Sequence, residues 1–299
     1  MDFFGGVELS PFSFTCLAAA SSIGSGLAAY LLRGPATRIG FVARSRRDRF
    51  GRGKTPLTGG LGLLAGICLA LLALRVRLPP AWIVGGGGFF LLGLLDDRFE
   101  FKPPAKFSGQ VAVALATAWL LGPSWRYAGL VVFLLLLLVN ASNFLDNMDG
   151  LLAGVALAEA VALLEFSLVA GPGAAVLVWA LPGILLLTIP PARVYLGDSG
   201  SHLIGALLAL EAARLLVQPD GLHTRYLLPL ALLFGVQIAD LTTVVVSRIR
   251  RRRPILRGGI DHLSHRLVRL GFSVPRAVFL LVLASGVCGL AALLLLFGS

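Results

Sequence analysis

Apolar runs of roughly 17–23 residues recur along the whole chain, and short polar segments separate them. An α-helix needs runs of this length to cross the hydrocarbon core of a bilayer, so the pattern predicts a polytopic membrane protein. Ten helices are expected, near residues 12–32, 57–77, 81–95, 105–122, 127–145, 150–170, 174–190, 200–217, 225–247 and 275–297. Together they are expected to form a single all-α integral membrane domain over residues 1–299.

The composition supports this prediction. Hydrophobic residues make up 57% of the chain and charged residues 14%, and the mean hydropathy is +0.87, which excludes a soluble globular protein. The formal net charge of +11 is typical of nucleic-acid binding, but a membrane protein uses arginine to set its orientation, so no nucleic-acid partner is expected. The three cysteines, Cys16, Cys68 and Cys288, lie in apolar runs without metal-ligand spacing and are expected to be packing residues.

The basic residues predict how the chain is oriented. Nineteen Arg and Lys residues fall in the odd-to-even connections between the expected helices, and five fall on the opposite side. Because cytoplasmic loops carry the excess of positive charge, both termini are expected outside and the protein in the inner (cytoplasmic) membrane. All the polar motifs then lie on the cytoplasmic side, which predicts one active site on that face. These motifs cover residues 54–60, 96–106, 140–150, 191–201 and 261–267.

The polar segment NASNFLDNMDGL, residues 140–151, interrupts two apolar runs. Acidic groups at the mouth of a hydrophobic segment are functional candidates by default. Four polar residues spaced three apart would cover half the circumference of an ideal helix, so one face cannot hold them all. The helix is therefore expected to end here, with Asn140, Asn143, Asp146 and Asp149 around a watery cavity. The alternative is that Asp146 and Asp149 only cap the next helix.

Three further aspartates end or begin expected helices. Asp96 and Asp97 end the third helix, and their mutual repulsion would be relieved by a divalent metal or a phosphate proton; a solvated helix end is the alternative. Asp198 precedes the eighth helix, where an N-cap is the simpler interpretation. Helix N-termini attract anions, and acids can hold Mg²⁺, so these groups predict one pocket for a pyrophosphate and Mg²⁺.

The segment GGIDHLSHRL holds His262 and His265, two of the four histidines, beside Arg266. They could bind phosphate or shuttle a proton, whereas a solvated amphipathic helix is the alternative. The run Arg250–Arg253 is expected to be a topology anchor, and Glu211 with Arg214 a structural pair. Asp240, about two turns from the cytoplasmic end of the ninth helix, could reach the cavity.

Taken together, these motifs resemble the polyprenyl-phosphate N-acetylhexosamine-1-phosphate transferases, the glycosyltransferase 4 family. That family includes the MraY-type enzyme of peptidoglycan synthesis and the WecA/TagO-type enzymes of O-antigen and teichoic-acid synthesis. The resemblance extends from about Lys54 to Phe272 and rests on five motifs in order: KTPLTGG, LLDDRFEFKP, NASNFLDNMDGL, PARVYLGDSGS and DHLSHRL. Each motif alone is a weak signal, and the ordered set is a specific one.

The resemblance implies a reaction. A polyprenyl phosphate, undecaprenyl phosphate in particular, would attack the β-phosphate of a UDP-N-acetylhexosamine, giving a lipid-diphosphate sugar and UMP. GlcNAc 1-phosphate is the expected group, Mg²⁺ the expected cofactor with Mn²⁺ as an alternative ion, and lipopolysaccharide, teichoic-acid or cell-wall synthesis the expected context. The sequence leaves the hexosamine, the prenyl length and the oligomeric state open, a homodimer included.

The resemblance also implies roles for individual residues. Asp198 would be the main Mg²⁺ ligand, with Asp97 and Asp146 as further ligands. Asp96 and Asp97 would face the lipid phosphate, one of them as a base, and Asp149 would line the nucleotide site with Asp146. Tyr195 would stack on uracil, and His262, His265 and Arg266 would contact diphosphate or sugar. The remaining expected substrate-binding residues are Lys54, Asn140, Asn143 and Arg193.

Two positions depart from the family pattern. Asn147 stands between the two acids where most members have Gly, and Ser264 interrupts the histidine-rich motif. The second departure favours the WecA/TagO-type branch over the alternative, a phospho-N-acetylmuramoyl-pentapeptide transferase. A lipid-linked transporter or flippase would place its ionisable groups near the midplane between repeated halves, whereas these acids lie at one face. A CDP-alcohol phosphotransferase ranks last because its spaced aspartate signature is not found.

Overall fold

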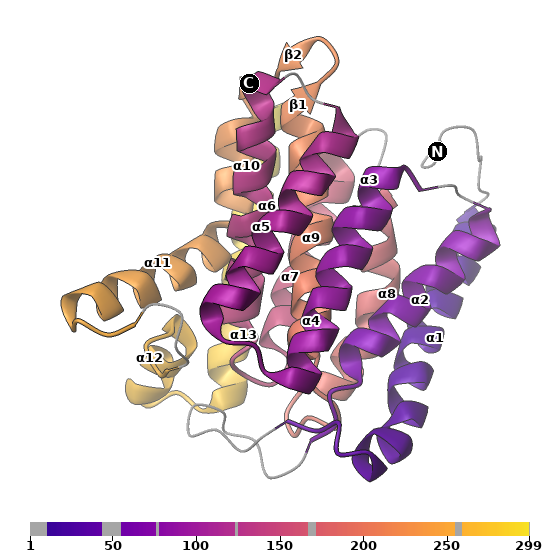
Figure 1. The fold of residues 1–299 in the computed structure, drawn as a ribbon, viewed down its shortest axis with the longest axis vertical. Helices are drawn as coiled ribbons and strands as arrows, with labels where there is room; N and C mark the ends of the chain where they lie inside the picture. The colour runs from indigo at the N-terminus through magenta and orange to yellow at the C-terminus, as the bar shows by residue number, and fades with distance from the viewer. Residues whose placement is uncertain are drawn as a thin grey trace.

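The computed structural model describes residues 11–43, 55–75, 78–122, 125–166, 172–254 and 259–298, and it is a bundle of helices with one two-stranded hairpin (Figure 1). The helices are α1 (Pro11–Arg38), α2 (Gly59–Leu74), α3 (Pro80–Trp82), the π-helical η1 (Ile83–Gly87), α4 (Gly88–Phe99), α5 (Pro103–Leu121), α6 (Trp125–Leu145), α7 (Leu151–Phe166), α8 (Pro172–Thr188), α9 (Gly197–Leu216), the 3₁₀-helical η2 (Thr224–Tyr226), α10 (Leu227–Leu233), α11 (Gly235–Arg250), α12 (Leu263–Arg269) and α13 (Val274–Phe297). Strands β1 (Val217–Gln218) and β2 (Gly221–Leu222) are antiparallel.

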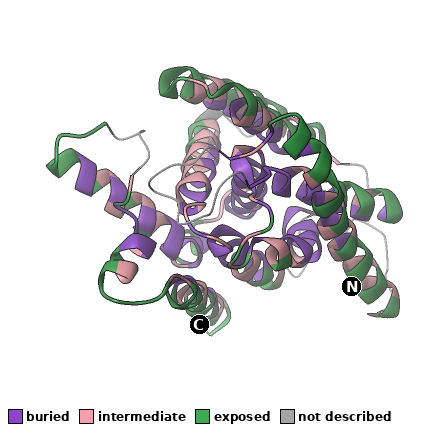
Figure 2. Ribbon diagram, turned by 90° about the horizontal axis from the view of Figure 1, so that it is seen from below, coloured by how far each residue is buried: buried purple, intermediate pink, exposed green. Residues whose placement is uncertain are grey.

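Helix α9 is the centre of the bundle. Every residue of α9 except Asp198 and Arg214 is buried, and α2, α4, α6 and α8 pack around it. A helix that is enclosed on all sides needs apolar or small side chains all round, which α9 has along most of its length. Figure 2 shows the buried residues gathered on the central helices, while the peripheral helices expose one face. The N-terminal end of α9 therefore has a fixed position within the bundle.

Small residues bring the neighbouring backbones close to α9. A Cβ atom on Gly60 of α2, Gly93 of α4 or Gly205 of α9 would lie closer than 3.0 Å to backbone atoms of the facing helix. The atom facing Gly93 is the carbonyl oxygen of Asp198. Helices that pack in lipid use small residues in this way, because close backbone contact replaces the hydrophobic driving force.

Most of the helices predicted from the apolar runs are confirmed, and two differ. The third predicted helix is built from α3, the π-turn η1 and α4, without a break in the chain. The ninth is interrupted at Phe234, where α10 and α11 meet at 70°. Within the described residues, three helices are long and apolar enough to span a membrane, α1, α6 and α13, and the bent pair would make a fourth.

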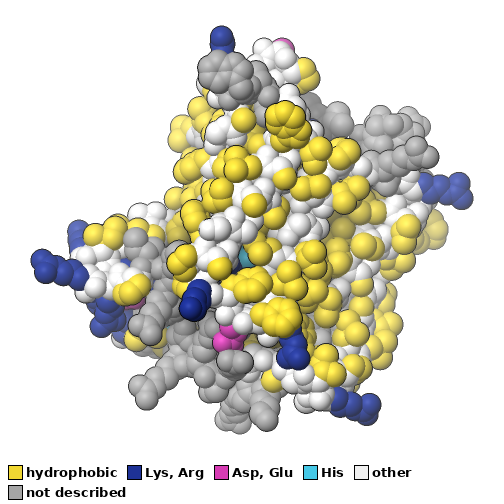
Figure 3. All heavy atoms as spheres, in the orientation of Figure 1, with side chains coloured by type: hydrophobic (Ala, Val, Ile, Leu, Met, Phe, Trp, Pro, Cys, Tyr) yellow, Lys and Arg dark blue, Asp and Glu magenta, His cyan; other side chains and the backbone are white. Residues whose placement is uncertain are grey.

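Helices α11 and α12 form an arm that projects from the side of the bundle (Figure 1). Hydrophobic side chains cover most of the face seen in Figure 3, whereas Lys and Arg side chains lie mostly along its margins and in its lower part, several of them on this arm. Arg248 and Arg250 occupy the last turn of α11. An apolar surface with basic residues at its margins is the distribution expected for a protein embedded in a bilayer.

Replacing Gly93 by alanine is expected to force α4 away from α9, because the new methyl group overlaps the Asp198 carbonyl. The expected destabilisation is roughly 1–3 kcal/mol, the usual cost of overpacking. The measurement is the thermal unfolding temperature of the detergent-solubilised protein. Gly129→Ala on α6, where a Cβ would meet nothing within 4 Å, is the matched control and should not lower this temperature.

Candidate active site

The five polar motifs meet at one end of the bundle through hydrogen bonds between them. The Tyr195 amide donates to the Pro56 carbonyl (2.9 Å), and the Asp198 amide donates to the Asp97 carboxylate (2.7 Å). Further bonds join Asn143 to Asp198, Ala192 to Asp149 and Ser264 to Asn147. Segments that lie up to two hundred residues apart in sequence therefore build one polar region.

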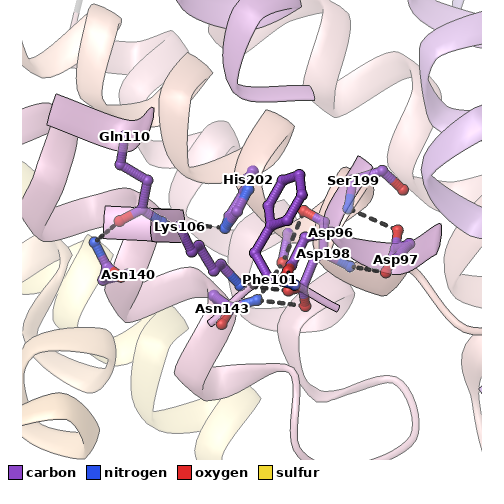
Figure 4. Close-up of polar contacts among 11 residues, drawn as sticks. Asp96, Asp97, Phe101, Lys106, Gln110, Asn140, Asn143, Asp198, Ser199 and His202 are labelled. Carbon is purple, nitrogen blue, oxygen red and sulfur yellow. Dashed lines mark hydrogen bonds and ion pairs between the residues drawn. The ribbon is translucent and has the colours of Figure 1, made fainter. Parts of the chain in front are cut away.

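A lysine lies at the centre of the acidic residues (Figure 4). The Lys106 ammonium, from the first turns of α5, lies 2.9 Å from Asp96 and also pairs with Asp198. Asn143 of α6 donates to the other oxygen of Asp198 at 2.8 Å and to Ser201 at 3.0 Å. Helices α5 and α6 thereby hold the Asp198 carboxylate of α9, and Lys106 offsets the repulsion between the acids. Asp96 is 8% exposed, so the alternative of a solvated helix end is wrong for this residue.

The Asp97 carboxylate caps α9 from the neighbouring helix. Its two oxygens accept hydrogen bonds from the amides of Asp198 (2.7 Å) and Ser199 (3.0 Å). The predicted N-cap at Asp198 is wrong, because the cap position is Leu196 and Asp198 lies within the first turn. The carboxylate satisfies amides that have no partner within α9 and interacts favourably with the helix dipole. Asp97 therefore occupies the helix terminus that the sequence suggests as a phosphate cradle.

A buried polar layer lies beneath these acids. Asn140 donates to the Gln110 side chain (2.9 Å), and the Gln110 amide nitrogen lies 3.3 Å from Nε2 of His202. Asn140 thus contacts the interior of the bundle, while the other predicted residues of its motif lie nearer the cavities. Lys106 ends the polar motif at residues 96–106 but was given no role from the sequence, and Gln110 and His202 were not predicted. The signal for these two is spacing: Gln110 lies four residues after Lys106 on α5, and His202 lies four residues after Asp198 on α9.

A cavity of about 600 Å³ opens beside the α6–α7 turn. Helix α6 ends at Leu145, as predicted, and Asp146, Asn147 and Asp149 line the cavity with Tyr195. Asp149 does not cap α7 by this contact; its Oδ2 accepts the amide of Ala192 at 3.0 Å and holds the 190–196 loop. The wall is completed by residues from α7, α8 and α13, namely Leu152, Ala153, Thr188, Val274 and Pro275.

A second cavity, of about 160 Å³, lies on the other side of the Tyr195–Asp198 turn. Asp96, Asp97 and Asp198 line it together with Arg98. The acids are thus divided between two adjoining cavities: Asp146 and Asp149 line the larger one, and the segment from Tyr195 to Asp198 contributes to both. Among the residues that the structure describes, no three His, Cys, Asp or Glu side chains gather as a metal-binding group.

Helix α12 carries the predicted histidines against the end of α6. His262 and His265 are 5% and 4% exposed, so the alternative of a solvated helix is wrong. Ser264 donates to the Asn147 side chain at 2.5 Å, and the His262 ring packs edge-on against Phe144. The two departures from the family pattern, Asn147 and Ser264, thus contact each other and join the α12 motif to the α6–α7 turn.

The basic residues predicted to bind substrate have different positions. Arg193 and Arg266 are exposed, and Arg266 donates to the Asp261 carbonyl at 3.3 Å. Arg248, in contrast, is buried, pairs with Asp261 at 3.7 Å and lies over the Phe144 ring. Lys54 lies outside the described residues. The structural pair predicted for Glu211 and Arg214 is confirmed at 3.0 Å.

Replacing Lys106 by glutamine is expected to leave Asp96 and Asp198 without their shared cation. The free energy of unfolding should fall by about 3 kcal/mol, because removing one partner leaves partly buried charge uncompensated. Thermal unfolding in detergent measures this loss. Lys102→Gln, an exposed lysine four residues earlier, is the control; equal stability of the two variants would contradict the structural importance of the Lys106 ion pairs.

Comparison with known proteins gives a consistent picture. The model of glycosyl transferase family 4 matches residues 80–215, which include Asp96, Asp97, the α6–α7 turn and Asp198. A decaprenyl-phosphate N-acetylglucosaminephosphotransferase of Mycobacterium tuberculosis is 32% identical over 320 residues, covering 88% of this chain and 78% of the relative.

Two further relatives extend the comparison to other bacteria. A probable undecaprenyl-phosphate N-acetylglucosaminyl 1-phosphate transferase of Bacillus subtilis is 27% identical, covering 87% of this chain and 78% of the relative. An undecaprenyl-phosphate alpha-N-acetylglucosaminyl 1-phosphate transferase of Escherichia coli is 26% identical, covering 86% and 77%. All three relatives are named for N-acetylglucosamine phosphate and none for a muramoyl pentapeptide.

Proposed function

The chain belongs to glycosyl transferase family 4, and on that premise we propose that it transfers N-acetylglucosamine 1-phosphate from a UDP-sugar to a polyprenyl phosphate. An oxygen of the lipid phosphate forms a new bond to the β-phosphorus of the nucleotide sugar. The bond between that phosphorus and the bridging oxygen breaks, and UMP leaves. The names of the relatives support this reaction over transfer of a muramoyl-pentapeptide phosphate.

The observation that carries the proposal is the Asp96–Lys106–Asp198 cluster beside a cavity of nucleotide-sugar size. The cavity of about 600 Å³ falls within the range of small-molecule sites. Tyr195 in its wall offers a ring for the uracil base, and Asp146 and Asp149 offer acceptors for ribose or base donors. The smaller acidic cavity, with Arg98 at its margin, is proposed to receive the lipid phosphate. The Tyr195–Asp198 turn between the cavities is where the two phosphates would meet.

Phosphoryl transfer depends mostly on positioning and on offsetting charge, and the residues of the site are suited to both. Lys106 and Asn143 orient the Asp198 carboxylate, and Asp97 fixes the backbone of Asp198 and Ser199 at the start of α9. His262, just before α12, and His265 within it lie against the end of α6 and are proposed to contact the diphosphate or the sugar.

The donor chemistry fits Mg²⁺. The ion typically takes one or two carboxylates and completes its shell with substrate phosphates and water, so a three-acid cluster is not required. Asp198 already pairs with a cation, the Lys106 ammonium, and is proposed as the main ligand, with Asp97 beside it. When bound there, Mg²⁺ would neutralise charge on the transferred phosphate. Asp146 lines the larger cavity, so it is proposed to bind the metal ion only where that ion is close to the nucleotide.

We further propose ten membrane crossings with the site on the cytoplasmic face and both termini outside. Gly40 and Phe41 line the small cavity and follow the end of α1, so the start of α1 lies away from the site. Val274 and Pro275 line the large cavity at the start of α13, so its C-terminal end also lies away from the site. These positions support termini on the opposite face.

Purified protein supplied with UDP-GlcNAc, undecaprenyl phosphate and Mg²⁺ is expected to release UMP and form the lipid-diphosphate sugar. Asp198→Asn should lower the rate at least about 100-fold, because the carboxylate is proposed to act at the transferred phosphate. Release of UMP is measured by chromatography. Asp220→Asn, in the exposed turn between β1 and β2, is the control with the same chemical change.

The outcome that contradicts the proposal is a folded wild-type protein that releases no UMP from any UDP-N-acetylhexosamine. A panel that includes UDP-GlcNAc, UDP-GalNAc and UDP-N-acetylmuramoyl pentapeptide separates the hexosamines from the muramoyl alternative. Normal turnover by Asp198→Asn would leave the reaction in place and overturn the role of this residue.

Removal of divalent ions with EDTA is expected to stop UMP release in the wild-type protein. Addition of excess Mg²⁺ should restore the rate, and Mn²⁺ should restore it in part, because both ions accept oxygen ligands. The rate is measured across a titration of each ion, with Zn²⁺ as a comparison. Undiminished release in EDTA would remove the metal from the proposal.

A further inference from the structure

His262 is held through one ring nitrogen by a buried carboxylate on the neighbouring helix. Its Nδ1 lies 2.8 Å from Oδ2 of Asp240, which is fully buried on α11. The other Asp240 oxygen accepts the amide of Leu263, the first residue of α12, at 2.7 Å. One side chain thus fixes both the start of the helix and the ring that precedes it.

The chemistry of this pair determines where the imidazole carries its proton. An ionised carboxylate only accepts hydrogen bonds, so Nδ1 of His262 must be the donor. The hydrogen bond made by one ring nitrogen decides the state of the other. Nε2 is then the atom that can meet a substrate.

A buried chain of polar side chains fastens the first turn of α11, three residues before Asp240. Gln237, one turn earlier on α11, donates to Glu159 of α7 and accepts from Ser142 of α6 at 3.0 Å. All three side chains are fully buried. This chain fastens α11 directly after the 70° bend at Phe234 and sets the direction in which Asp240 points.

We propose that Asp240 is a positioning residue that sets the tautomer and orientation of His262 for sugar-phosphate transfer. This inference rests on the proposed function, in which His262 contacts the diphosphate or sugar. Asp240 does not touch substrate: it is fully buried and acts through the imidazole. The arrangement follows the general rule that a functional histidine needs a partner on its other nitrogen.

Asp240→Asn is the decisive variant. Asparagine can keep its oxygen toward the Leu263 amide, so the cap on α12 is retained, and it turns an NH₂ group toward His262. Nδ1 must then accept, and the ring must carry its proton on Nε2. The expected result is a fall in kcat of at least about tenfold with a change in KM for UDP-GlcNAc below about threefold.

Nitrogen-15 NMR of the imidazoles reads the tautomer without any turnover. The chain has four histidines, and comparison with His262→Asn assigns the resonances of His262. In the wild-type protein Nδ1 of His262 should carry a proton, and in Asp240→Asn it should not. An unprotonated Nδ1 in the wild-type protein overturns the inference even if the variant fails to fold.

A double-mutant cycle separates positioning from simple support of the fold. If Asp240 acts through the ring, Asp240→Asn should cost no more than about twofold in kcat on a His262→Asn background. An equal loss on both backgrounds, or an unchanged kcat in the single variant, contradicts the inference. Wild-type protein that releases no UMP would instead contradict the proposed function. The NMR measurement would still test the tautomer of His262, because it does not depend on turnover.

Discussion

The bond between the Asp97 carboxylate and the first amides of α9 is the interaction on which the site depends. The first amides of α9 have no partner within the helix, and no side chain of its own caps it. A carboxylate supplied by α4 meets that requirement and at the same time fixes Asp198 at the junction of the two cavities. The position of the Asp198 carboxylate is therefore a consequence of helix packing as much as of the local motif.

A carboxylate holds the start of a helix at two other places in the bundle and holds a loop at a third. Glu211 of α9 accepts the amides of Gly173 and Ala174 at the start of α8, and Asp240 accepts that of Leu263 at the start of α12. Asp149 accepts the amide of Ala192 in the loop before α9. Neither α9 nor α12 has a side-chain cap of its own. In this protein acidic side chains from one helix terminate another, which ties distant segments together where polar backbone would otherwise be exposed to an apolar environment.

Much of the architecture could be predicted from the sequence. Long runs of apolar residues without a polar face identify helices that lie in lipid. The end of α6 at Leu145 and the association of the five motifs follow from polar residues at the ends of apolar runs. The carboxylate caps could not be predicted, because Asp97 and Asp198 are separated by a hundred residues. In the sequence, Asp198 is an equally suitable cap for the helix that it begins. The bend at Phe234 could not be predicted either, because the apolar pattern of α10 continues into α11. The direction of α11 is evident only from the buried contacts among Ser142, Gln237 and Glu159.

The role of Lys106 could not be predicted from its motif, and Gln110 and His202 could not be predicted at all, because both lie in segments with the composition of an ordinary membrane helix. Their importance comes from facing one another across α5, α6 and α9, and no spacing within a single segment reveals such a contact. The division of the acidic residues between two cavities has the same origin, since it depends on the path of the Tyr195–Asp198 turn between them.

The bend between α10 and α11 places the two halves of the polar region on different supports. The carboxylates of Asp97 and Asp198 belong to the innermost helix and its neighbour, so their position follows from the packing of the bundle. Asp240 and His262 lie on the lateral arm, which the Ser264–Asn147 bond and the packing of His262 on Phe144 join to the end of α6. A substitution at Asn147 or Ser264 would therefore reach the imidazoles while leaving the anchoring of the acids intact.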